Sequence, residues 1–279
     1  MTTLWYFLAS ALTLIQAHHV LLVHNMGTKS HLITMKPLVE ELLVSQNKVT
    51  AILYSSLKLT HDNYTEIMVT TDMDKFYKEV SQKVMEKGGG NLLSPSLWLY
   101  AYNKYKSMME ELALGVFHPE GVQKLIKDRP KMDALITFFP GNAVFAEIFD
   151  CPVINFSPVS PIILFMGGSG NTINHSIQPY IAVPFLEPMT FLERMSNHAM
   201  IYFIDIFMNW LTASQFEYQE EFLSSQLGVE VVHPGITMRE KLALVVAASH
   251  PITHGAWQYA PNVVEVRTEC TESTASSCN

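Results

Sequence analysis

A short apolar strand that runs straight into a helix near the N-terminus limits the possible folds of this chain more than any other feature. Residues 19–43 read HVLLVHNMGTKSHLITMKPLVEELL. The run Val20–Val23 is typical of a parallel strand that is covered on both faces. Residues 25–29 break the pattern, and Ser30 is then a suitable N-cap for a helix. Apolar residues follow at helical spacing: Leu32, Met35, Leu38, Val39, Leu42 and Leu43.

His31 lies at the start of this predicted helix. A side chain there points into the crevice beyond the carboxyl end of the strand, where open α/β sheets bind ligands. His31 is therefore the first candidate for chemistry. Spacing alone leaves a second interpretation open, in which His31 is simply a polar residue in the first helical turn.

Further strands and helices alternate along the chain, which predicts an α/β fold with a single Rossmann-like, doubly wound and mainly parallel sheet. Between residues 156 and 189, prolines and glycines mark a long irregular segment, and such segments are commonly functional or lid-like. Strands are predicted at 49–54, 66–69, 133–137, 152–156 and, as the last strand, 242–249. Helices are predicted at 72–87, 95–116, 120–126, 143–149, 189–211 and 214–227.

Composition excludes several classes of function. With 48% hydrophobic and 16% charged residues, the chain can form a large core. A net charge of −8 without a basic run argues against a nucleic-acid partner. The cysteines Cys151, Cys270 and Cys278 have neither metal-ligand spacing nor a disulfide framework, so no metal site is predicted. A dinucleotide oxidoreductase is disfavoured because no G-x-G-x-x-G motif follows the first strand.

The first 17 residues are predicted to be a secretory signal peptide. Leu4–Ile15 is apolar but short for a membrane span, and Gln16-Ala17 offers a cleavage end. The preceding residues lack Lys and Arg, so a hydrophobic first helix of the mature fold remains the alternative. A secreted chain would make Asn63 and Asn174 glycosylation acceptors, since both lie in N-x-S/T sequences. No later apolar stretch predicts a membrane anchor in the mature chain.

Several stretches, in this order and spacing, resemble the N-terminal half of the animal UDP-glycosyltransferases, especially the insect members. The first is SHLITMKPLVEELL after the opening strand. The others are similar to the strands and helices around the acceptor pocket and the approach to the interdomain linker. They are MDALIT (132–137), AEIFDCPVINFSP (146–158), MTFLERMSN (189–197), LALVVAASHP (242–251) and YAPNVVEV (259–266).

This resemblance implies one half of a GT-B fold, in which the N-terminal domain binds the acceptor and the C-terminal domain binds the UDP-sugar. Transfer in the family inverts the anomeric centre and needs neither a metal nor a cofactor, since the UDP-sugar is a co-substrate. The histidine that opens the first helix acts as general base, and His31 matches it. The resemblance also implies small lipophilic hydroxyl acceptors and a location in the endoplasmic reticulum, in the lumen or associated with its membrane.

The chain departs from the family at the acidic partner of this histidine. Alignment places Thr137 or Phe138 at that position, and neither can carry a negative charge. Asp133 matches an acid earlier in the strand and is not expected to be the partner. Glu147 and Asp150 are not expected to replace the missing acid, because they lie in a predicted helix and in a loop. Loss of the partner should weaken the base by roughly tens to thousands-fold, given that general-base catalysis contributes about 10²–10⁴.

After Val266 the residues 267–279 lack apolar periodicity and predict an unstructured tail. The expected organisation is thus a signal peptide at 1–17, a Rossmann-like acceptor-binding domain at 18–266 and this tail, with the donor-binding domain missing. We therefore expect little independent transferase activity from the chain. The alternative is a non-catalytic module that binds lipophilic ligands or pairs with full-length family members and modulates them.

Overall fold

The computed structural model describes residues 17–25, 29–69, 78–79, 82, 95–158, 176–180, 185, 188–232, 234–248 and 259–266. The predicted signal peptide, except Ala17, lies outside the described residues, as do the tail at 267–279 and Asn174. Most of the predicted helix 72–87 and of the Pro/Gly-rich segment also lies outside them.

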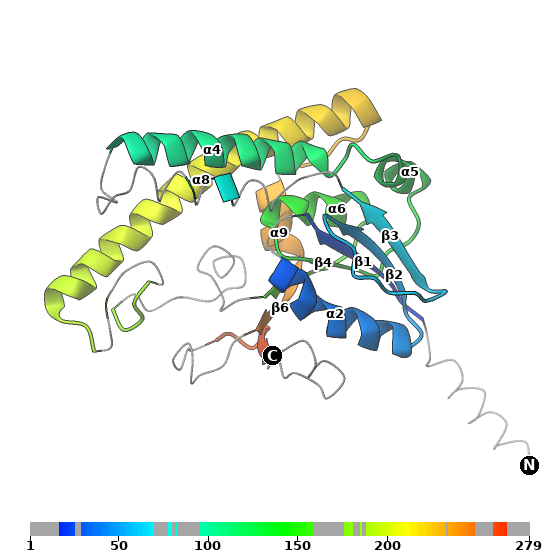
Figure 1. Ribbon diagram of the computed structural model, residues 1–279, viewed down its shortest axis with the longest axis horizontal. Coiled ribbons are helices and arrows are strands. Elements are labelled where there is room, and N and C mark those ends of the chain that lie inside the picture. The colour runs from blue at the N-terminus through cyan, green and yellow to red at the C-terminus, as the bar shows by residue number, and fades with distance from the viewer. Residues whose placement is uncertain are drawn as a thin grey trace, which may run out of the picture.

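A seven-stranded sheet forms the centre of the described structure (Figure 1). Its strand order is β3-β2-β1-β4-β5-β6-β7, and every neighbouring pair is parallel. The α/β prediction with a parallel sheet is confirmed. The strands are β1 (His19–His24), β2 (Lys48–Leu53), β3 (Tyr64–Met68), β4 (Ala134–Thr137), β5 (Val153–Ser157), β6 (Leu242–Ala248) and β7 (Val263–Val266).

Helices cover both faces of this sheet, as the doubly wound prediction requires. In Figure 1, α2 lies on one side, and α5 and α6 lie on the other. A long helix, α8, runs alongside α4 (Figure 1). The helices are α2 (Lys29–Val44), α4 (Pro95–Gly115), α5 (Glu120–Asp128), α6 (Val144–Ile148), α8 (Phe191–Leu227) and α9 (Pro234–Lys241), with a 3₁₀ turn at Pro140–Ala143.

The alternation of side chains along β1 explains the two-sided core. Leu21 and Val23 point into a cluster with residues of α5, α6, α8 and α9. Val20 and Leu22 point to the opposite face, where α2 packs. Because successive strand residues face opposite ways, a strand covered on both sides must be apolar throughout.

The predicted break inside residues 189–227 is wrong, because α8 is one continuous helix of 37 residues. Polar residues around Ser214 suggested two helices, but the stretch contains neither proline nor glycine to stop one. A capping box begins it: Thr190 Oγ1 accepts from Glu193 N–H, and the Glu193 carboxylate accepts from Thr190 N–H. Gly228, at a φ of 63°, ends it.

Three smaller differences concern the start of the first helix and two elements that were not predicted. The first helix begins at Lys29, so Ser30 lies inside its first turn rather than at the N-cap. Helix α9 was not predicted, and β7 follows the strand that we expected to be last. The strand β7 has only four residues and joins the sheet through β6, so its pairing is decided by tertiary contacts rather than by a local pattern.

The N-terminal half of α8 carries exposed large apolar side chains, namely Phe191, Leu192, Met195, Met200, Tyr202, Phe203 and Ile206. Among the described residues, no helix is both long enough and apolar enough to cross a bilayer.

Candidate functional site

The candidate site lies at the carboxyl edge of the sheet, where β1 and β4 are neighbours. The connection after β1 leads through α2 to β2, whereas the chain beyond β4 leads to β5 on the other side. A crevice forms at such a switch point because the two connections leave in opposite directions. His31, in the first turn of α2, is placed at this edge as the sequence predicts.

The rings of Phe138 and His24 lie beside His31, and the described residues provide no charged partner. The His31 ring centroid lies 5.7 Å from that of Phe138 in an edge-on arrangement, and 6.2 Å from that of His24. Its Nδ1 atom is buried without a hydrogen-bond partner in this part of the chain. Burial lowers the pKa of His31 because the charged imidazolium loses hydration. The ring is therefore neutral at pH 7 and able to accept a proton.

His24 is a second histidine at this site, and the sequence reasoning missed it. It is the last residue of β1 and only 1% exposed. Its ring lies 5.9 Å from Tyr54 and 6.3 Å from Phe138. Burial, followed by the proximity of His31, lowers the pKa of His24 to about 3. The available signal was a histidine directly after the apolar run Val20–Val23, at the carboxyl end of the strand.

The carboxylates that could have served His31 are engaged elsewhere. Asp133 lies before β4, at the amino edge of the sheet, where it accepts from His19 N–H at 2.8 Å and pairs with Lys131 at 3.0 Å. The hydrogen bond from His19 N–H is the largest cause of the lowered pKa of Asp133. Glu147 accepts from the Thr237 hydroxyl, and Asp150 pairs with Lys241.

Buried polar side chains hold the two segments that form the site. The Asn142 amide donates to Asn25 Oδ1 and to Thr137 Oγ1, each at 3.0 Å. Asn25 donates in turn to Leu112 O, which ties the residue after β1 to α4. All three polar side chains are at most 1% exposed. The network therefore fixes the end of β1 relative to the end of β4.

A separate hydrogen bond holds the backbone of Phe138, one of the two residues expected, with Thr137, at the position of the missing acid. The Asn155 amide of β5 donates to Phe138 O at 3.2 Å, and Asn155 is fully buried. This contact secures the backbone of Phe138 directly after β4, while its ring stands against His31. The hydrogen bond thus fixes the backbone from which this ring extends.

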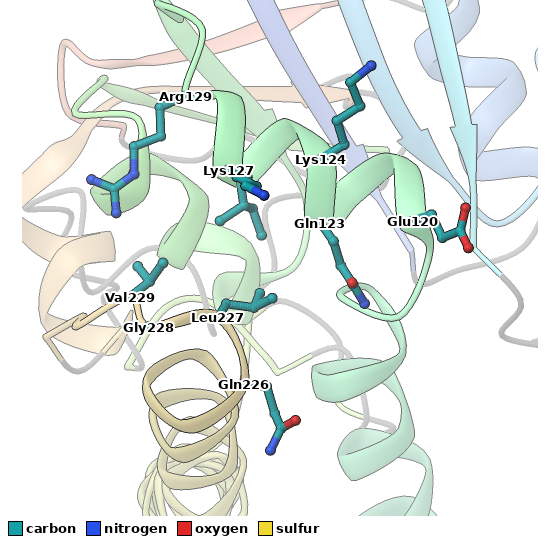
Figure 2. Close-up of a pocket in the computed structure, with 10 residues that line it drawn as sticks. Glu120, Gln123, Lys124, Lys127, Arg129, Gln226, Leu227, Gly228 and Val229 are labelled. Atoms are coloured by element: carbon teal, nitrogen blue, oxygen red, sulfur yellow. The ribbon is translucent and has the colours of Figure 1, made fainter.

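A pocket in another part of the molecule lies between α5 and the C-terminal end of α8 (Figure 2). It shares no lining residue with the cluster around His31. In Figure 2, Lys124, Arg129 and Glu120 point in different directions, so their charges do not converge on one ligand position. Elsewhere, too, no three His, Cys, Asp or Glu side chains of the described residues could hold a metal ion.

Asn63 lies in the turn before β3 and is partly exposed, and the adjoining Thr65 is exposed. Both residues of this glycosylation sequence are therefore at or near the surface. Modification at Asn63 stays a prediction.

The amino-acid sequence is similar to that of known proteins. The family model described as "UDP-glucoronosyl and UDP-glucosyl transferase" matches residues 19–255. UDP-glycosyltransferase UGT4 of Dactylopius coccus is 25% identical over 253 residues, which cover 86% of this chain and 46% of that protein. UDP-glucuronosyltransferase 2B7 of Homo sapiens is 22% identical over 218 residues, which cover 71% of this chain and 39% of that protein. The chain spans less than half the length of these two curated relatives.

Solved structures give more distant similarities. The glycotransferase of kitacinnamycin is 13% identical with a TM-score of 0.42, covering 84% of this chain and 46% of that one. The apo structure of Phytolacca americana UGT2 is 10% identical with a TM-score of 0.40, and the match covers 91% of this chain and 52% of that one.

The buried amide of Asn142 should contribute measurably to stability. Asn142→Ala leaves the buried acceptors of Asn25 and Thr137 without this donor, so we expect a loss of about 1–3 kcal/mol in the free energy of unfolding. Urea denaturation measures it. The control is Thr34→Ala, which removes an exposed hydrogen bond to Ser30 O and should cost less than about 0.5 kcal/mol. Equal unfolding midpoints for the two variants would contradict this role.

His24 should make the fold sensitive to acid. The unfolded chain takes up a proton at the ordinary pKa of about 6.5, whereas folded His24 does so only near pH 3. The free energy of unfolding should therefore fall as pH is lowered from about 6.5 towards 3, by up to about 1.4 kcal/mol per pH unit from this group. Urea denaturation across this range should show a shallower pH dependence of the free energy of unfolding for His24→Phe. The control Thr34→Ala removes no titratable group and should keep the wild-type pH dependence. A wild-type dependence in His24→Phe would refute the assignment.

Proposed function

Since this chain belongs to the UDP-glycosyltransferase family, we propose that residues 18–266 form the acceptor-binding side of a hexosyl transfer from a UDP-sugar to a small lipophilic hydroxyl compound. We further propose that this unit is the N-terminal half of a GT-B arrangement. The observation that supports the proposal most is the position of His31, a neutral and half-buried histidine at the ligand-binding edge of the sheet.

In the proposed reaction, His31 takes the proton of the acceptor hydroxyl on Nε2, because its Nδ1 is buried. The acceptor oxygen then forms a bond to the anomeric carbon of the UDP-sugar. The bond between that carbon and the phosphate oxygen breaks, and UDP leaves with the electron pair. Attack from the face opposite UDP inverts the anomeric centre. The lowered pKa of His31 suits this role, since a base must be unprotonated to accept the proton.

The surroundings of His31 support a lipophilic acceptor. Phe138 and Tyr54 belong to the aromatic cluster around the two histidines. Small-molecule sites combine apolar and aromatic walls with a few placed polar groups, and here a histidine supplies the polar group. These apolar walls place no carboxylate beside the imidazolium that forms when His31 takes the proton. We therefore propose that His31 is a weaker base than a histidine with an acidic partner.

A second function is favoured by Phe138. Its ring stands against His31 at the place where the family resemblance leads one to expect the acid. A site without that acid is suited to holding a lipophilic ligand without reaction. In this alternative the chain is a non-catalytic module that binds such ligands or pairs with full-length family members and modulates them.

We also propose that the chain enters the secretory pathway and works in the endoplasmic reticulum, in the lumen or associated with the membrane. The apolar segment Leu4–Ile15 supports entry. The surface position of the Asn63 sequence is compatible with modification there.

Replacing His31 should separate catalysis from binding. With radiolabelled UDP-glucose and a panel of phenols, His31→Gln should lower the transfer rate by about 10²–10⁴ if His31 is the base. Acceptor affinity, measured by calorimetry, should stay within a few-fold. His19→Gln is the matched control, because His19 begins the same strand at the opposite edge of the sheet.

Turnover that is equal in the wild type and His31→Gln would exclude His31 as the base. Acceptor binding without turnover in the wild type would favour the non-catalytic module. That module should alter the rate of a co-expressed full-length relative, and the effect should survive His31→Gln.

A carboxylate at position 138 should raise the pKa of His31. Phe138→Asp places a negative charge beside the ring and stabilises the imidazolium. An NMR titration of the histidine ring protons measures the shift. Phe138→Leu is the control, since it removes the aromatic ring without adding charge and should give no comparable increase. A His31 pKa that is the same in both variants would show that position 138 does not face the histidine.

Entry into the secretory pathway should leave glycans on the chain. Expressed in insect cells, the protein should shift to higher mobility on gels after endoglycosidase treatment. Asn63→Gln and Asn174→Gln should each remove one step of that shift, and the double variant should remove it entirely. The step from Asn63 is expected because its sequence lies at the surface. Wild-type protein that migrates identically before and after treatment would show that neither Asn63 nor Asn174 is glycosylated.

A further inference from the structure

His24 is a buried titratable group that the proposed reaction does not use. Its side chain is 1% exposed, and its Nε2 atom has no hydrogen-bond partner among the described residues. A buried polar atom without a partner has lost its hydrogen bonds to water, so each such atom calls for an explanation. His31 Nδ1 is in the same condition at the same edge of the sheet.

The two histidine rings are neighbours. Their centroids are 6.2 Å apart, and their planes are inclined by 58°. The other rings around His24 belong to Phe138 and to Tyr54, which adds a hydroxyl group, and His31 is the neighbour whose ring carries nitrogen atoms. The two ring nitrogens do not bond to each other directly. A water molecule that bridges two polar groups is nearly as favourable as a direct hydrogen bond.

The charge state of His24 suits it to accept a hydrogen bond. Because burial keeps the pKa of His24 near 3, its ring is neutral at physiological pH. A neutral imidazole with its proton on Nδ1 presents a lone pair at Nε2. The proton position of one ring nitrogen is set by the hydrogen bond that the other nitrogen makes. An acceptor facing His31 Nδ1 therefore keeps the proton there and leaves Nε2 free.

We propose that His24 is the positioning residue of His31, with His24 Nε2 accepting, through one water molecule, the hydrogen bond that His31 donates from Nδ1. This inference rests on the proposed function, in which His31 Nε2 takes the acceptor proton. No proton moves to His24. Its lone pair holds the tautomer of His31 in place of a carboxylate and stabilises the imidazolium less, because the ring is uncharged.

The tautomer of His31 is the direct test. Nitrogen-15 NMR of the full chain, labelled at histidine, distinguishes a proton on Nδ1 from one on Nε2. Wild-type His31 should carry the proton on Nδ1. His24→Phe removes the acceptor and should shift the proton of His31 towards Nε2. His24→Gln, whose side-chain oxygen can accept a hydrogen bond, should retain the Nδ1 proton.

A wild-type His31 with its proton on Nε2 would overturn the proposal without any variant, even if His24→Phe failed to fold. Retention of the Nδ1 tautomer in a folded His24→Phe would overturn it as well. His19→Phe is the control, since His19 lies at the other end of β1 and should leave the His31 tautomer unchanged. The NMR measurement needs neither the UDP-sugar nor the hydroxyl substrate. A negative result is therefore distinct from a failure of sugar transfer or of substrate binding.

Discussion

The buried amide of Asn142 is the interaction on which the site depends most. It joins the residue after β1 to the last residue of β4, through Asn25 and Thr137. Parallel strands pair along their length, but their ends lead into connections that run in opposite directions. The link reinforces the pairing of Val23 with Thr137, the residues directly before His24 and Phe138. Because the linking groups are buried, losing one bond leaves an unsatisfied polar atom rather than a hydrated one.

Burial without an opposing charge is the second property of this site. Both histidines lose hydration, and the described residues bring no carboxylate to either one. Their pKa values therefore move downwards, and the rings stay neutral at physiological pH. A site of this kind works through lone pairs and ring dipoles rather than through ion pairs. Our proposals of a lipophilic acceptor and of a base weaker than a histidine held by an acid rest on this property.

The sheet and its helices supply a rigid platform for these rings. Each residue of β1 from Val20 to Val23 is buried, on alternating faces, so the strand cannot slip in register without exposing apolar side chains. The strand ends in His24, and α2 begins shortly after it. His24 and His31 are thus brought to one edge by a single strand–helix unit, whose apolar residues do most of the packing.

The sequence by itself determined the α/β class, most strands and the position of His31, because apolar periodicity and a strand–helix transition are local signals. Through the family resemblance, it also predicts Thr137 or Phe138 at the position where an acid is expected. Only the tertiary structure decided what surrounds His31. The contacts of His31 with Phe138 and His24 join residues that belong to different parts of the fold. The continuity of α8 and the addition of β7 were likewise decided by packing, since polar residues do not stop a helix and a four-residue strand needs a partner.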